Sequence, residues 1–106
     1  MSAYIRIIYD KLDFLEFKQN ILFLKQPQHK ASVFNELSLD DFLKIRDFTR
    51  DVEEKINDGK VLSFEDYEKG LFEVWPPIRS YPASSTLIAK ALMSAGNYDK
   101  LFQHNN

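Results

Sequence analysis

The side chains in this chain that could carry out chemistry are few, and most of them are carboxylates. The 106 residues include no cysteine and two histidines, His29 and His104. Without thiols, the chain has no disulfides, thiolate zinc sites or cysteine nucleophile. His29 lies in a polar stretch and His104 near the C-terminus, so the sequence shows no converging set of metal ligands. We therefore expect no metal and no cofactor.

Paired carboxylates are the remaining candidates for acid–base catalysis. Asp40 precedes Asp41, and Glu53 precedes Glu54. Adjacent residues on a helix point in different directions, so neither pair brings two carboxyl groups onto one substrate. No Ser-His-Asp arrangement and no glycine-rich phosphate loop is present, because the three glycines are isolated. We predict a protein that is not an enzyme and has no small-molecule substrate.

The acids concentrate in the middle of the chain. Residues 36–73 hold twelve acids and six bases, a charge of −6, while the segments before and after them carry +2 each, which gives −2 overall. An acidic surface repels nucleic acid and attracts basic partners. The alternative is that these acids only form the solvated faces of surface helices. Four of them recur at helical spacing along one outward line: Asp47, Asp51, Glu54 and Asp58.

Two similar segments indicate the elements that position these acids. Residues 37–42 and 62–67 each place a serine, Ser38 or Ser63, three positions before an acid and between flanking apolar residues. This is the pattern of a capping box with a hydrophobic staple at a helix start. With no credible strand after either segment, the sequence predicts an all-α fold.

The chain is expected to form one domain over residues 1–106, a compact bundle of about four helices. We place the helices at 4–25, 39–58, 64–75 and 83–95, followed by a last turn that packs back through Tyr98, Leu101 and Phe102. Residues 26–30 are expected to form a linker, and residues 31–36 to add a turn anchored by Val33 and Phe34. Gly59 stands where a helix C′ residue is expected. The three prolines in segment 75–82 predict a stiff, extended connection before the last helix.

The first helix carries two apolar stripes. One contains Ile5, Ile8, Leu12 and Leu15, and the other contains Phe14, Phe17, Ile21 and Leu24. Two stripes predict a helix that is buried over much of its circumference. A strand over residues 4–9 is the alternative. The predicted core comprises Phe14, Phe17, Ile21, Phe42, Ile45, Phe48, Val52, Leu71, Phe72, Leu87 and Leu92.

The segment 75–82 is also a candidate binding site. It combines Trp75, Arg79 and Tyr81, residue types that are enriched at binding hot spots, with a stiff backbone that loses little entropy on binding. The alternative is that Trp75 belongs to the core and the prolines only turn the chain.

In size, acidity and helical patterning the chain resembles small all-α bacterial immunity proteins of the bacteriocin or contact-dependent-inhibition type. The residues that carry this resemblance are the acidic helix starts, the line of four acids and the aromatic segment 75–81. The resemblance implies a protein-binding inhibitor that neutralises a basic toxin domain, such as a nuclease, through an acidic helical surface. The partner-binding residues are then expected to be Asp47, Asp51, Glu54, Asp58, Trp75, Arg79 and Tyr81.

Two other functions compete with the inhibitor. A helical adaptor or transcription-regulatory module of phage or plasmid type would be favoured by dimerisation through an exposed apolar stripe. A small enzyme or ligand-binding bundle would need an enclosed polar pocket with a perturbed carboxylate. The N-terminus shows no secretory signal, and the longest apolar run, 21–24, is far too short to span a membrane. We therefore expect a cytoplasmic protein with neither a membrane nor a nucleic acid as its partner.

Overall fold

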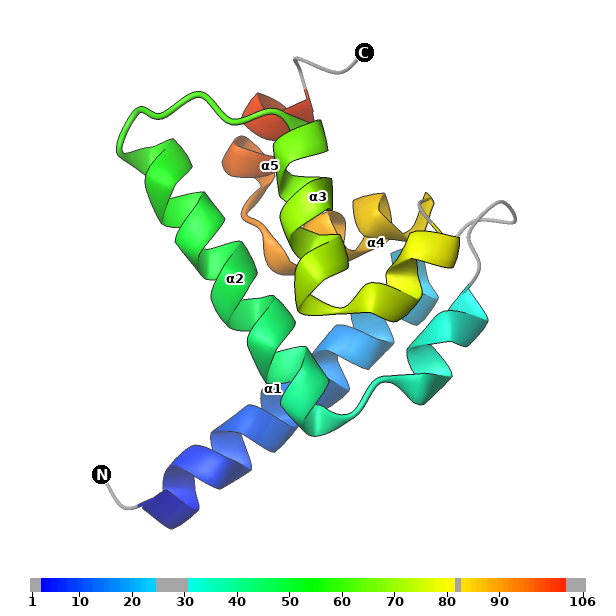
Figure 1. Ribbon diagram of the computed structural model, residues 1–106. Coiled ribbons are helices and arrows are strands. Elements are labelled where there is room, and N and C mark those ends of the chain that lie inside the picture. The colour runs from blue at the N-terminus through cyan, green and yellow to red at the C-terminus, as the bar shows by residue number, and fades with distance from the viewer. Residues whose placement is uncertain (1–2, 25–30, 82, 103–106) are drawn as a thin grey trace.

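The computed structural model describes residues 3–24, 31–81 and 83–102, and within these ranges it contains helices and no strand. The predicted linker at 26–30 lies outside the described residues. Residues 4–9 are helical as predicted and do not form the strand that was the alternative, and the all-α class is confirmed. Figure 1 shows the helices in chain order. Their bounds are α1 Ala3–Leu24, η1 Ala31–Glu36, α2 Leu39–Asn57, α3 Phe64–Val74, η2 Pro76–Ser80, α4 Ala83–Leu92 and α5 Ala95–Phe102, where η denotes a 3₁₀ helix.

Both predicted helix starts are confirmed as capping boxes. The Asp41 amide donates to Ser38 Oγ at 3.1 Å, and the Asp41 carboxylate accepts from the Ser38 amide at 3.4 Å. The same pair of bonds joins Ser63 and Asp66. Each box satisfies two backbone donors that a helix end leaves open and fixes where α2 and α3 begin. Gly59 follows α2 with φ +92°, a left-handed conformation that favours glycine over residues with a side chain.

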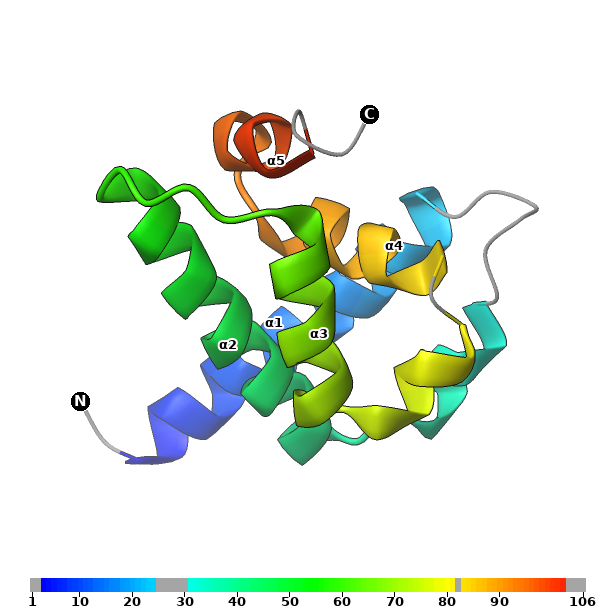
Figure 2. The same cartoon turned by 45° about the horizontal axis from the view of Figure 1, so that its top comes forward.

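Helices α2 and α3 form a hairpin with a close contact at its centre (Figure 2). The ring of Phe48 stacks on Tyr67 with centroids 5.5 Å apart. Gly70 faces that stack, because a Cβ built on it would lie 2.5 Å from Phe48 Cζ. Glycine therefore allows the Phe48 ring to lie directly against the α3 backbone.

Aromatic rings connect α1, η1, α2 and Trp75, the C-cap residue of α3, through the core. Phe42 of α2 packs against Phe14 and Phe17 of α1 at 5.1 and 5.2 Å between centroids. Phe17 meets Phe34 of η1, and Phe34 stacks on Trp75 at 5.9 Å. The core expected from the sequence is correct in that each of its members is buried or packs against buried residues. Buried aromatic area dominates the packing energy of a domain of this size.

The connection before α4 differs from the prediction. Pro76 to Ser80 form the short helix η2 and not an extended strap. The fixed φ of proline suits the first position of a helix, and the side chain of Ile78 is fully buried, which favours a backbone that turns inward. The C-terminus differs as well, because the helix predicted at 83–95 is divided: α4 ends at Leu92, Met93 and Ser94 follow it, and a distinct helix α5 begins at Ala95.

The largest difference from the sequence-based expectation concerns α1. Its second stripe packs on the core, with Phe17 and Ile21 each 2% exposed. Its first stripe, which was expected to be buried too, faces outward, and the N-terminal half of the helix extends beyond the other helices (Figure 1). The expectation was wrong because the remaining helices are too few to cover both faces of a helix of 22 residues.

Candidate functional site

Four carboxylates form a line along the outer face of α2, and the last of them, Asp58, is the C-cap residue of this helix. We call Asp47, Asp51, Glu54 and Asp58 the acidic line. All four are exposed, whereas Ile45, Thr49 and Val52 on the opposite face are buried. The alternation follows from helical geometry, since residues three and four apart share a face. The sequence-based placement of these acids on one outward line is therefore what the structure shows.

Basic neighbours neutralise only part of the acidic line. Asp51 pairs with Lys55 at 3.1 Å, and Asp47 lies 3.3 Å from the Nε of Arg46. Glu54 and Asp58 make no ion pair with the residues that the structure describes. Exposed pairs of this kind contribute little to stability and exchange easily with other partners. The face therefore presents negative charge to an approaching cation.

Arg46 joins this face to α1. Its Nη1 atom lies 2.9 Å from Asp10 Oδ1 and 3.2 Å from Asp13 Oδ2. Burial alone lowers the pKa of Arg46, but the hydrogen bonds and charges of Asp10 and Asp47 outweigh it and raise the pKa above its ordinary value. Arg46 is fully charged at any physiological pH, and it fixes α1 against α2.

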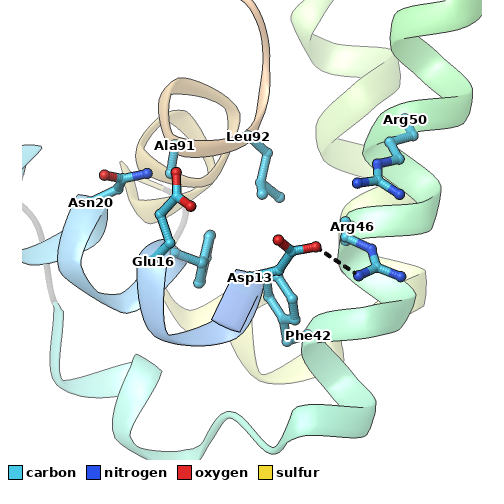
Figure 3. Close-up of a pocket in the computed structure, with 9 residues that line it drawn as sticks. Asp13, Glu16, Asn20, Phe42, Arg46, Arg50, Ala91 and Leu92 are labelled. Carbon is cyan, nitrogen blue, oxygen red and sulfur yellow. Dashed lines mark hydrogen bonds and ion pairs between the residues drawn. The ribbon is translucent and has the colours of Figure 1, made fainter. Parts of the chain in front are cut away.

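A small pocket lies between α1, α2 and α4 beside Arg46 (Figure 3). Its volume is about 140 Å³, below the roughly 300 Å³ at which ligand sites usually begin. Asp13 and Glu16 project from one wall, and Arg46 and Arg50 project from the other. No serine, histidine or lysine is among the described residues that line it, so it offers no hydroxyl, imidazole or amine nucleophile.

The aromatic half of the predicted interface is placed differently from the acidic half. Trp75 is 3% exposed and stacks on Phe34, so the structure selects the core alternative, and its indole does not reach the surface. Arg79 is exposed on η2, and Tyr81 is half-buried after it. Figures 1 and 2 both show α3 between α2 and η2. The acidic line and the η2 segment therefore do not form one continuous surface.

Sequence reasoning missed a second surface, on α1. Of the ten large hydrophobic side chains that are exposed in the described part of the chain, nine lie on α1 and the tenth is Val61. Five of the nine share one face, which we call the outer stripe: Ile5, Ile8, Leu12, Leu15 and Leu22. Each is between 41% and 63% exposed. A concentration of apolar area of this kind on one element is typical of an interaction site.

The described residues contain no group of three or more histidine or acidic side chains placed to hold a metal ion. None of the described helices is both long and apolar enough to cross a membrane. No protein-family model matches the chain, and comparison with curated proteins and with solved structures found no similar protein. The inference about function therefore depends on the surfaces themselves.

Proposed function

We propose that the chain is a protein-binding inhibitor of the immunity type, which neutralises a basic toxin domain in the cytoplasm through the acidic line of α2. The observation that carries this proposal is the exposure of four aligned carboxylates on a rigid, doubly capped hairpin. A fixed array of like charges attracts a partner of opposite charge from a distance and orients it as it arrives.

A nuclease fits this surface among basic toxins, because its active site must attract a polyanion. Glu54 and Asp58 of the acidic line would occupy cationic subsites of the nuclease that otherwise hold phosphates. Asp47 and Asp51 would exchange their pairs with Arg46 and Lys55 for pairs with basic side chains of the partner. Inhibition would then need no chemistry by this chain. Trp75 takes no part in this version of the interface, since it is buried.

The test is co-purification of the tagged chain with the product of the adjacent reading frame, followed by titration of the complex with salt. The proposal expects a one-to-one complex with a basic, toxic protein whose affinity falls steadily as salt rises. A partner that is not basic, or an affinity that does not depend on salt, would refute binding through the acidic line.

One observation favours a second candidate, a helical adaptor or regulatory module. The outer stripe of α1 is the kind of exposed apolar surface through which such modules dimerise or bind other helices. Absence of a toxin complex, together with self-association or recovery of DNA with the purified chain, would favour this candidate over the inhibitor.

A further inference from the structure

The outer stripe of α1 has the spacing of a coiled-coil seam. Ile5, Ile8, Leu12 and Leu15 are separated by three, four and three residues, and the same alternation continues through Gln19 and Leu22. These are the a and d positions of a heptad repeat, with Ile5 at a and Ile8 at d. A narrow a/d seam is suited to another helix, whereas a helix on a globular core presents a wider stripe.

The same helix packs on the core through its opposite side. Phe14 and Phe17 lie nine residues after Ile5 and Ile8, which at about 100° per residue is half a turn around the helix. They contact Phe42, while the outer stripe remains exposed. Because the core and the seam lie back to back, a second helix can lie along the seam with the two bodies on opposite sides.

Charges beside the seam identify its occupant. Lys11 falls at position g and Glu16 at position e of the following heptad, and both are exposed. In a parallel, in-register coiled coil, position g of one chain faces position e five residues later in the other. Two copies of α1 would therefore form two Lys11–Glu16 pairs related by two-fold symmetry. We propose that α1 binds a second copy of this chain as a parallel two-stranded coiled coil.

Other residues beside and within the seam support the parallel arrangement. The same g-to-e relation brings Tyr4 of one chain to Tyr9 of the other. It also brings Lys18, whose Nζ lies 4.0 Å from the centroid of the Phe14 ring in the single chain, to the other chain's Phe23, which is 91% exposed. In an antiparallel pair, position g of one chain would instead face position g of the other. Lys11 would then lie opposite Lys18 of the other chain, and the two positive charges would repel each other. Gln19 at an a position adds a polar layer, and buried amides at such positions specify register.

A membrane surface fits the outer stripe less well than a second helix does. Helices that lie on anionic membranes carry a basic polar face. Helix α1 has three basic residues and three acidic residues, so it lacks that excess of positive charge. The projecting N-terminal half also gains most from a helical partner, because a short helix is marginally stable in water when nothing packs on it.

The first test is the mass of the full-length chain by sedimentation equilibrium. The proposal expects a dimer, and Leu12→Glu should raise the dissociation constant by about 100-fold or more, since it buries a charge in the seam. Leu12 is 53% exposed in the single chain, so this change leaves the fold intact. Val61→Glu is the matched control, because Val61 is 79% exposed in the connection between α2 and α3, and its change should leave the mass unaltered.

Charge reversal tests the pairing across the seam. Lys11→Glu or Glu16→Lys alone should raise the dissociation constant of the dimer on the order of tenfold. Each change places like charges opposite one another at both of the symmetry-related pairs. The double variant should restore the wild-type affinity, since the two pairs form again with their charges exchanged. Equal weakening in the single and double variants would refute the assigned pairing.

Cysteine cross-linking tests the orientation, and the chain has no cysteine to interfere. In the proposed dimer, Leu15→Cys places two thiols in one d layer, within disulfide reach. The expected result is efficient oxidation of Leu15→Cys to a linked dimer and none for Val61→Cys. Preferential linking of Leu12→Cys to Leu15→Cys chains would indicate an antiparallel pair. That result, a strictly monomeric chain, or a monomer that co-sediments with anionic phospholipid vesicles would overturn the proposal.

Discussion

The hydroxyl of Tyr67 lies 3.0 Å from the Oγ1 of Thr49, and both side chains are 1% exposed. The two residues come from facing positions on α2 and α3, the helices whose capping boxes and close packing hold the acidic line in place. Each hydroxyl satisfies the other in a site from which water is excluded. Removing one of them leaves its partner buried without this bond, which costs more than an exposed hydrogen bond is worth.

We therefore predict that Tyr67→Phe lowers the free energy of unfolding by about 1–2 kcal/mol. Thr49→Val should cost a similar amount. The double variant should cost less than the sum of the two, because it leaves no buried hydroxyl without a partner. Urea denaturation of the four proteins measures this coupling, and strictly additive losses would show that the bond contributes nothing.

The same phenol predicts a loss of stability in alkali. Burial raises the pKa of Tyr67 well above its ordinary value, and the hydrogen bond with Thr49 opposes this shift in part. Between the unfolded pKa of about 10 and the higher folded pKa, only the unfolded chain releases this proton. The stabilisation is complete below about pH 10, and above it stability should fall by up to about 1.4 kcal/mol per pH unit.

Tyr67→Phe removes this contribution, so the difference in stability between wild type and variant should shrink as the pH rises from 9 to 11. Taking the difference cancels the titration of lysines and of the other tyrosines. A difference that stays constant over this range would show that Tyr67 ionises as readily in the folded state as in the unfolded chain.

Whether Gly70→Ala lowers or raises the free energy of unfolding should depend on the residue at position 48. In the wild type the new Cβ would meet the Phe48 ring, and displacing that ring from Tyr67 should cost about 1–3 kcal/mol. In a Phe48→Ala background the obstruction is gone, and Gly70→Ala should stabilise by about 0.5–1 kcal/mol through helix propensity. Thermal unfolding of the wild type, the two single variants and the double variant measures the effect of Gly70→Ala in each background. A change of stability in the same direction in both backgrounds would contradict the packing of Phe48 against Gly70.

Removing the hydroxyl of Ser85 should raise the stability of the protein. Its Oγ is buried in α4 and has no hydrogen-bond partner among the residues that the structure describes. Ser85→Ala keeps the small size that the site requires and removes the cost of burying an unsatisfied polar atom, so stability should rise by about 1 kcal/mol. A lower melting temperature in calorimetry would show that the hydroxyl has a partner after all.

The helices that carry the acidic line could be predicted from sequence because their signals are local. Two helix starts are determined by a serine and the acid three residues after it, at Ser38 and at Ser63. The end of α2 is determined by Gly59, and none of these signals needs a contact with the rest of the chain. Once a helix begins at Leu39, its period of 3.6 residues places Asp47 and Glu54 on the face opposite Ile45.

The missed features depend on contacts between elements. The sequence left both the core and the interface open for Trp75, and its contact with Phe34 decides for the core. The helix η2, which was not predicted, forms where Ile78 finds a buried site. The periodicity of α1 shows two apolar faces but not which of them the other helices reach. Lys11 and Glu16 beside the first stripe were the available signal for the helical partner that we propose.

Charge reversal tests whether the acidic line binds a basic partner. The triple variant Asp47→Lys, Asp51→Lys, Glu54→Lys reverses three of the four charges of the acidic line. A control reverses three exposed acids elsewhere: Glu36→Lys, Glu73→Lys, Asp99→Lys. Each variant moves the net charge from −2 to +4, since three reversals add six charges. Circular dichroism and thermal unfolding should show that both variants fold.

The decisive measurement is the affinity of each variant for the co-purified toxin domain by calorimetry, with growth of toxin-expressing cells as the second readout. We predict that the acidic-line variant loses at least about 100-fold in affinity and fails to protect, while the control stays within about tenfold of wild type. Equal affinities for the two variants would contradict the account, because binding would then depend on net charge or on another surface and not on the acidic line of α2.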